Sequence, residues 1–398
     1  MKTDKPDACT IITTQGKVQY SRYKLRPTNK EERQLLEDMT GIRSVVPLDD
    51  YLGITQLPFR MSIRAMLEVA FWAQNQCSYQ RAKDILAKNG MIVNDETIRL
   101  VTNYVGNYVF KNDCKKAEEI YIDYSKCKLD FPLNLDGVLY IQTDGAALNT
   151  RTKNAEGSTW RENKLGEVFS SNNIRFWTDK HGNRQHRILK REYISFLGKV
   201  DDFKWHLLSC AVRGGYGKFK KTVLLSDGAT WIRNMTEEIF PDAQQILDFY
   251  HLCENVNTFA KILFGNDESR YKPWAKDVCD TLKKSGYQKV LNDIKSTKDV
   301  KLDNCSVNLY AYISNNINNI DYATYIENGY FIGSGAIESG NKLILQQRLK
   351  QAGMRWNVDT AQPILTLKTK QESGLWEIDV VTPFIDHCYS LIKKVTYK

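Results

Sequence analysis

The segments Val138-Leu139-Tyr140-Ile141-Gln142-Thr143-Asp144-Gly145 and Thr222-Val223-Leu224-Leu225-Ser226-Asp227-Gly228 share one pattern. Each is an apolar run, rich in β-formers, that closes with a polar residue, an aspartate and a glycine, which predicts a buried strand ending in a turn. A third carboxylate, Glu338, follows the glycine-bearing turn Gly333-Ser334-Gly335-Ala336-Ile337 and opens a predicted helix. If the two strands are neighbours, Asp144 and Asp227 lie side by side, and Glu338 reaches them from a helix packed across the strand ends.

Three converging carboxylates are typical of a divalent-metal site for phosphoryl transfer. Mg²⁺ prefers oxygen ligands, and two-metal sites hold their ions roughly 3.5–4 Å apart. One Asp-Gly pair after a strand is most often only a turn. Two pairs with matching flanks, followed by Glu338, favour a site that binds two Mg²⁺ or Mn²⁺ ions through Asp144, Asp227 and Glu338.

Composition limits the classes of protein to consider. The chain has 398 residues, 42% hydrophobic residues and a formal net charge of +9, which suits a multidomain globular protein with an anionic partner or simply a basic solvated surface. No apolar run is long enough to span a bilayer and the N-terminus has no signal-peptide pattern, so no membrane partner is expected. The nine cysteines are scattered without zinc-site spacing, which suggests a reducing cytoplasm.

The expected fold class is α/β: a mixed sheet flanked by helices, with an all-α insertion and an N-terminal helical region. The pattern divides the chain into a small β/α element (1–57), a helix-turn-helix region (58–110), a linker or trailing helix (111–134), a first part of the sheet domain (135–251), a helical insertion (252–329), a second part of the sheet domain (330–372) and a C-terminal tail (373–398). Between the key strands the pattern predicts a polar loop at 149–165, a hairpin around His181-Gly182-Asn183, and helices at 203–212 and 231–239.

The helix-turn-helix prediction rests on capping residues. Ser78 precedes one helical pattern, Asn89-Gly90 ends it, and Asn94 precedes a second helix at 95–105. A plain helical hairpin has the same spacing and is an equal alternative. If the second helix enters a major groove, Arg99 and Asn103 are the exposed polar residues expected to contact DNA.

Basic and aromatic residues cluster around the predicted site. Lys342 lies one helical turn after Glu338, and Arg348, Arg355 and Trp356 follow, so this segment is expected to contact DNA phosphates or bases. A solvated face with a buried Trp356 is the alternative. His251, in Asp248-Phe249-Tyr250-His251, is a further catalytic candidate, with a structural histidine as its alternative.

Several motifs, taken in order, resemble bacterial insertion-sequence transposases of the DDE class, closest to the Kra and Lre groups. They are Thr143-Asp144-Gly145-Ala146, Trp160-Arg161-Glu162-Asn163-Lys164-Leu165-Gly166, Ser226-Asp227-Gly228-Ala229-Thr230-Trp231-Ile232, Asp248-Phe249-Tyr250-His251, Ile332-Gly333-Ser334-Gly335-Ala336-Ile337-Glu338-Ser339 and Gly353-Met354-Arg355-Trp356. The resemblance implies a ribonuclease-H-like core whose triad is Asp144, Asp227 and Glu338. It also implies that Asp248 and His251 match a signature of transposases with a helical insertion. Residues 20–46 hold no cysteine, unlike the cysteine-rich segment of relatives, so no zinc site is expected there.

The sequence therefore predicts a DNA transposase that cleaves the ends of an insertion sequence and joins them to target DNA, working as a homo-oligomer on paired ends. Two alternatives stay open. One is a non-enzymatic DNA-binding protein, such as a domesticated copy or self-repressor, and the other is a structure-selective nuclease.

Overall fold

A computed structural model describes residues 2–3, 5–125, 135–265, 267–295 and 308–393. The chain forms two compact units. The first, the end unit, comprises Met1–Asp113, Asn149–Lys153 and Gln346–Lys398; the second, the sheet unit, comprises Cys114–Leu148 and Asn154–Leu345. Each is described by itself.

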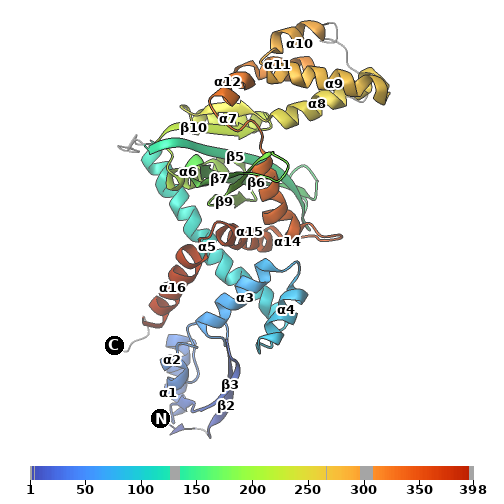
Figure 1. Cartoon of the computed structure of the whole chain (residues 1–398). Helices are drawn as coiled ribbons and strands as arrows, with labels where there is room; N and C mark the ends of the chain where they lie inside the picture. Colours follow the sequence, from blue (N-terminus) through green and yellow to red (C-terminus); the bar gives the residue numbers. More distant parts are fainter. Residues whose placement is uncertain (1, 4, 126–134, 266, 296–307, 394–398) are drawn as a thin grey trace. The chain divides into compact units, whose positions relative to one another are not determined.

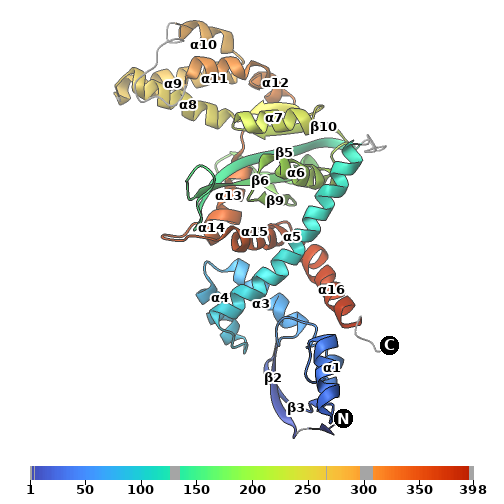
Figure 2. The same ribbon diagram turned by 180° about the vertical axis from the view of Figure 1, so that it is seen from behind.

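The sheet unit is built on a mixed five-stranded sheet in the order β11-β10-β5-β6-β9 (Figures 1 and 2). Its strands are β5 (Leu135–Asn149), β6 (Trp160–Ser170), β9 (Glu192–Phe196), β10 (Phe219–Ser226) and β11 (Gln244–Leu247). β10 is parallel to both β5 and β11, and β6 is antiparallel to β9. The predicted mixed sheet is therefore present, and the two strands that carry Asp144 and Asp227 are neighbours in it.

Helices cover both faces of this sheet. On β6, a Cβ at Gly166 would meet Leu207 and Phe203 of α6 (Val200–Gly214). On the other face, Gly340 of α13 (Gly335–Asn341) lies against β6 and β9, where a Cβ would meet Leu165 and Tyr193. Because successive strand residues point to opposite faces, α6 and α13 lie on opposite sides of the sheet. The helix α7 (Thr230–Ile239) joins the α6 side through the core cluster of Phe203, Met235 and Ile239.

A helical block follows β11 and precedes α13. It contains α8 (Phe249–Leu263), α9 (Glu268–Lys283), α10 (Tyr287–Asp293), α11 (Leu309–Asn315) and α12 (Tyr322–Glu327). Its apolar residues share one core with the sheet, in which Val223 and Leu225 of β10 accompany Phe249, Leu252 and Leu282 of the helices. The segment expected to be helical is helical where the structure describes it, and residues 296–307 lie outside the described residues.

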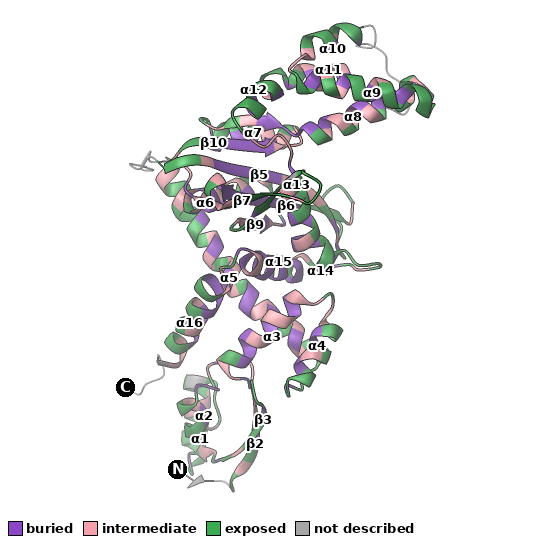
Figure 3. Ribbon diagram, in the orientation of Figure 1, coloured by how far each residue is buried: buried purple, intermediate pink, exposed green. Residues whose placement is uncertain are grey.

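The end unit is mainly helical, with a small N-terminal β/α element of β1 (Lys2–Thr3), β2 (Asp7–Thr13), β3 (Gly16–Arg22), β4 (Leu25–Arg26), α1 (Lys30–Thr40) and α2 (Pro47–Tyr51). The core combines α3 (Ile63–Asn75), α4 (Tyr79–Lys88) and the first part of α5 (Asp95–Ser125) with α15 (Val358–Glu372) and α16 (Thr382–Lys393). The middle of α15 is buried on all sides, which Figure 3 shows as an almost continuous purple helix. Two of its lysines, Lys368 and Lys370, are paired with carboxylates.

The predicted capping residues of the helix-turn-helix region act as caps. The Ser78 hydroxyl accepts a hydrogen bond from the N–H of Arg81, and the Asn94 side chain accepts one from Thr97. Gly90 takes a left-handed conformation, with φ of 83°, directly after the end of α4. These bonds satisfy N–H groups that a helix start leaves without partners. They fix where α4 and α5 begin without establishing that this pair of helices binds DNA.

Of four expectations about organisation, two differ from the structure. The helix that starts at Asp95 continues to Ser125, so the segment expected to be a linker or a trailing helix (111–134) is helical as far as it is described. Residues 346–372, assigned from the sequence to the sheet domain, belong to the end unit, where α15 packs on α3. The expected polar loop is shorter, because β6 begins at Trp160. The predicted hairpin around His181-Gly182-Asn183 is present as β7 (Ile174–Thr178) and β8 (Arg184–Ile188), which pair with each other as a two-stranded sheet.

Tertiary packing is the physical reason for the two differences. Polar and charged residues at 160–164 obscure the local pattern, whereas tertiary packing supplies the burial that sets these elements. No helix within the described ranges is both long enough and apolar enough to cross a bilayer.

Candidate active site

Asp144 and Asp227 extend from neighbouring parallel strands. The register pairs Leu225 of β10 with Gln142 of β5. Two residues further along each strand bring Asp227 level with Asp144, since residues two apart point to the same face. The register therefore brings the two positions to the same edge of the sheet, and the charge of Asp227 acts on Asp144.

Glu338 is carried to this place by two hydrogen bonds between α13 and β5. The N–H of Ile337 donates to Gln142 Oε1 at 3.0 Å, and Asn341 Nδ2 donates to Asp144 Oδ2 at 2.6 Å. Glu338 lies between these two anchors, in the first turn of the helix, and is exposed. The helix start is thus fixed over the face of β5 that carries Gln142 and Asp144.

Asp248 anchors the turn before α13. One carboxylate oxygen accepts hydrogen bonds from the N–H groups of Tyr250 and His251 at the start of α8. The other accepts bonds from the N–H and the hydroxyl of Ser334. With Asp248 only 1% exposed, its carboxylate links the end of β11 to the turn that leads to Glu338. Its role in this structure is to position that turn.

The three carboxylates share one electrostatic environment. The pKa of Asp144 is raised from 3.8 to about 6, chiefly by burial and in addition by the negative charges of Asp227 and Glu338. The N–H of Gly145 and the amide of Asn341 act in the opposite direction by stabilising the charged form. A cation at this place would relieve the repulsion and would favour the deprotonated carboxylate.

These residues suit a divalent cation that prefers oxygen ligands better than a metal that prefers cysteine or histidine ligands. All three charged ligands are hard carboxylates, and the buried Oδ1 of Asn341 has no hydrogen-bond partner. In the described conformation, Asp144 and Asp227 accept hydrogen bonds from Gly145 and Ala229. Across the described residues, no group of three or more His, Cys, Asp or Glu side chains is already arranged to hold a metal ion. The ligand chemistry of these side chains fits a hard divalent cation.

His251 lies on the surface of α8. Its ring is partly exposed, with Nδ1 3.6 Å from the carboxylate of Glu254 on the next turn of the same helix. In the part of the chain that the structure describes, the ring makes no contact with the three carboxylates. Its catalytic role stays a prediction from the resemblance, without support from geometry.

Two of the predicted DNA-contacting residues are exposed and two are buried. Lys342 and Arg355 are exposed, and the N–H of Lys342 bonds to the carbonyl of Glu338, one turn earlier. Arg348 is 2% exposed and Trp356 is 8% exposed. The guanidinium of Arg348 donates to the carbonyl of Ala73 at 2.9 Å and lies over the rings of Tyr79 and Trp356. The expectation that Arg348 contacts DNA is therefore wrong for this conformation, and Trp356 follows the alternative of a buried tryptophan, because both side chains belong to the core of the end unit.

Arg99 and Asn103, the two residues expected to enter a major groove, are partly covered or paired within the protein. Arg99 forms a salt bridge with Glu96 on the preceding turn. Asn103 is only partly exposed, and its side-chain oxygen is buried. The sequence places both on one helix but cannot show which face the neighbouring helices cover. The DNA contact of Arg99 stays a prediction, whereas Asn103 is not the exposed residue that the sequence suggested.

Sequence analysis missed Gln142 and Asn341, the two amides that join α13 to β5. A signal for each was present. Gln142 is a polar residue inside an otherwise apolar strand, and Asn341 lies three residues after Glu338, a spacing that puts two side chains on one helix face. Their roles became visible only when the distant partners were placed.

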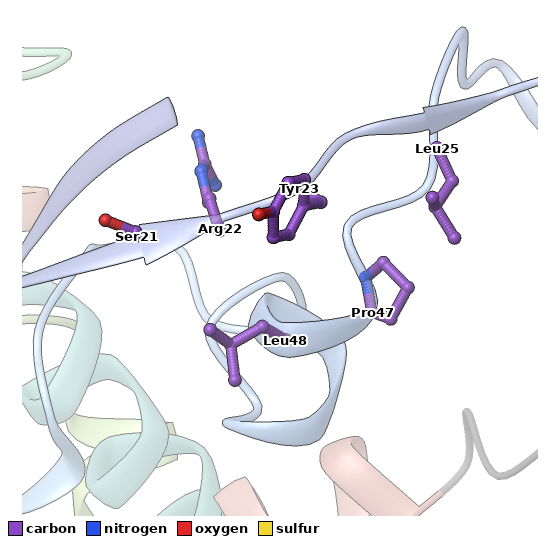
Figure 4. A pocket seen from close by; sticks show the side chains of 6 residues that line it. All are labelled: Ser21, Arg22, Tyr23, Leu25, Pro47 and Leu48. Carbon is purple, nitrogen blue, oxygen red and sulfur yellow. The ribbon is translucent and has the colours of Figure 1, made fainter. Parts of the chain in front are cut away.

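A cavity in the N-terminal element has a volume of about 520 Å³ and is mostly apolar (Figure 4). Its lining comprises Ser21, Arg22, Tyr23, Leu25, Pro47 and Leu48. The one charged side chain among these, Arg22, is buried and paired with the carboxylate of Asp49. The charge of Arg22 is therefore used within the N-terminal element, and the carboxylate cluster remains the candidate site.

Comparison with known proteins extends over both units. The chain is 24% identical over 382 residues to a protein of Streptococcus gallolyticus described as "UPF0236 protein in vanSb 3'region". The alignment covers 94% of this chain and 75% of that relative. No family model matches the chain.

Proposed function

We propose that this protein is a DNA transposase that cuts DNA at the ends of an insertion sequence and joins them to a target. The observation that carries the proposal is the meeting of Asp144, Asp227 and the Glu338 helix over adjacent parallel strands, with Asn341 bonded to Asp144. The mixed sheet with β5 at its centre supports the ribonuclease-H-like core implied by the motif resemblance. The net charge of +9 suits a polyanionic substrate.

In this proposal the chain's residues bind and orient two divalent ions and the DNA strand. Asp144 and Asp227 would hold Mg²⁺ or Mn²⁺ from the strand ends, and Glu338 would complete the ligand set from α13. Bound divalent ions supply activation of a water or 3′-hydroxyl and stabilisation of the leaving oxygen. Asn341 keeps Asp144 in place, and Asp248 keeps the turn before Glu338 in place. Cleavage and joining are both in-line displacements at phosphorus, so one site can serve both.

The direct test is incubation of the purified protein with labelled DNA from both sides of its own gene. We expect strand breaks at defined positions with Mg²⁺, and joined products when a target plasmid is added. A chelator should abolish both. Binding without breaks would indicate a DNA-binding protein, and breaks without joining would indicate a nuclease; either outcome would refute the transposase proposal. Sizing of the protein–DNA complex would test the expected homo-oligomer.

The raised pKa of Asp144 predicts that both the stability of the folded protein and its binding of a metal ion depend on pH. The folded protein keeps a proton on Asp144 up to a pH of about 6, whereas the unfolded chain releases it near 3.8. The tighter binding of this proton in the folded state stabilises the fold. The stabilisation is fully present below pH 3.8, the pKa of Asp144 in the unfolded chain, and is lost as the pH rises through about 6. Metal binding requires the deprotonated form and therefore follows the opposite trend.

Mg²⁺ should accordingly raise the thermal unfolding midpoint at pH 8 and have much less effect at pH 5. At ten times its Kd, a ligand stabilises the folded state by about 1.4 kcal/mol, which corresponds to a shift of several degrees. The Asp144→Asn variant serves as the control and should show little Mg²⁺ effect at either pH. An equal effect of Mg²⁺ on the parent protein at both pH values would contradict the assignment of Asp144 as a ligand.

A further inference from the structure

The hairpin of β7 and β8 has two different faces. Its register pairs Arg175 with Arg187, Phe176 with His186, and Trp177 with Gln185. Alternation along the strands therefore gives one face to Phe176 and His186, and the other to Arg175, Arg187, Trp177 and Gln185. We call the second set the basic face of the hairpin.

The first face packs onto the sheet unit on the side of the candidate active site. The ring of His186 lies 4.8 Å from that of Phe331, and Phe331 lies 5.2 Å from Tyr140 of β5. Tyr140 precedes Asp144 by four residues on the same strand face, a separation of about 13 Å. The hairpin is therefore held on the face of the sheet that carries Asp144 and α13, with its basic face turned away from that packing.

The basic face carries charge that the protein does not neutralise. Arg175 and Arg187 are exposed and directly opposite each other, an arrangement that destabilises a strand pair. Within the described ranges, neither forms an ion pair. Arg191, just beyond the hairpin, differs in this respect, since it donates to the buried carboxylate of Glu167 at 2.9 Å. Lys180 and Lys190 add exposed positive charge at the two ends of β8.

An exposed aromatic ring accompanies these arginines. Trp177 is 45% exposed and follows Arg175 by two residues on the same face. An indole ring left in water beside two guanidinium groups combines the two features of strand-binding surfaces: cations for phosphates and a flat ring for a base. An acidic protein surface would use the charges but leave the tryptophan without a partner.

We propose that the basic face binds a DNA strand, with phosphates on Arg175 and Arg187 and an unpaired base stacked on Trp177. The proposal deepens the proposed function, because it rests on DNA being the substrate and adds a contact surface on the side of the sheet that carries Asp144. It assigns to the hairpin a strand-holding role that is separate from metal binding and from the helices of the end unit.

The test compares two double variants in a chelator, so that no cleavage occurs. R175Q/R187Q removes the opposed arginines, and the matched control K272Q/K276Q removes two exposed lysines that are already paired with Glu268 and Asp280. We expect R175Q/R187Q to bind a DNA duplex with a single-stranded overhang at least about 10-fold more weakly. Each lost phosphate contact lowers the slope of log K against log salt by about 0.9 on duplex DNA and about 0.7 on single strands, so two lower it by about 1.4–1.8. The control should keep the parent's affinity and slope.

Stability separates binding from misfolding. Because the two arginines repel each other, R175Q/R187Q should unfold at the same temperature as the parent or a higher one while binding DNA more weakly. W177A should lose about 10-fold in affinity for the overhang substrate, as expected for one stacked base, with little change for a blunt duplex and none in salt slope. W177F should recover much of that loss.

Unchanged affinity and slope in R175Q/R187Q, or an equal loss in the lysine control, would overturn the proposal. A protein that cuts DNA with Mg²⁺ but is unaffected by the hairpin variants leaves the transposase function standing and removes only the hairpin's role. A parent protein that binds no DNA at all removes both.

Discussion

Replacing Asp227 with asparagine is expected to reduce Mg²⁺-dependent DNA cleavage and joining by roughly 10³-fold or more, while DNA binding stays the same or improves. A carboxylate that holds a catalytic metal contributes several kcal/mol to the transition state, and about 4 kcal/mol corresponds to that factor. Asparagine keeps the oxygen that accepts the N–H of Ala229 at 2.8 Å, so the turn after β10 should persist. Loss of one negative charge also lowers repulsion of the DNA phosphates.

The matched control for this variant is Asp242→Asn. Asp242 is an exposed aspartate of the same unit, placed after α7, outside the carboxylate cluster. It should cut DNA like the parent, as measured by strand breaks over time on a labelled end substrate. If Asp227→Asn retains the parent's cleavage rate, the three carboxylates are not the catalytic centre, whatever their arrangement.

Replacing Arg348 with alanine is expected to destabilise the end unit by about 3–5 kcal/mol, the range for truncating a large, fully buried side chain. The variant loses hydrogen bonds to the carbonyls of Ala73 and Cys77 at the end of α3. It also removes the guanidinium from between Tyr79 and Trp356. The Arg348→Lys variant should not recover this stability, because an ammonium group cannot stack on the two rings and donate to the carbonyls at the same time, as the planar guanidinium does.

Arg355→Ala is the control for Arg348→Ala, since Arg355 is an exposed arginine seven residues later. It should change stability by no more than about 0.5 kcal/mol. Thermal unfolding and limited proteolysis of the region around α3 and α4 measure both variants. If the Arg348→Ala protein is as stable as the parent but binds DNA more weakly, Arg348 contacts DNA as the sequence suggested.

Local chemistry explains why part of this protein could be predicted from its sequence. The key strands are predictable because they are apolar and rich in β-forming residues. Ser78 and Asn94 predict helix starts because their side chains accept hydrogen bonds from N–H groups that have no partner within the helix. The helical block after β11 follows from 3.6-residue periodicity. These features depend on neighbours in the chain, and each has the expected place in the structure.

Contacts between residues far apart in the sequence decided which polar side chains are buried and how they pair. Arg348 and Arg355 look alike as sequence, yet contacts with α3 and α4, about 270 residues earlier, bury the first and leave the second exposed. The role of Asn341 depends on Asp144, 197 positions away, and that of Asp248 on Ser334, 86 positions away. The opposed arginines of the hairpin depend on strand register. The sequence alone determined which residue types and local elements were present, whereas burial and pairing of polar groups were decided by tertiary structure, because the cost of burying a charge depends on partners that no local pattern specifies.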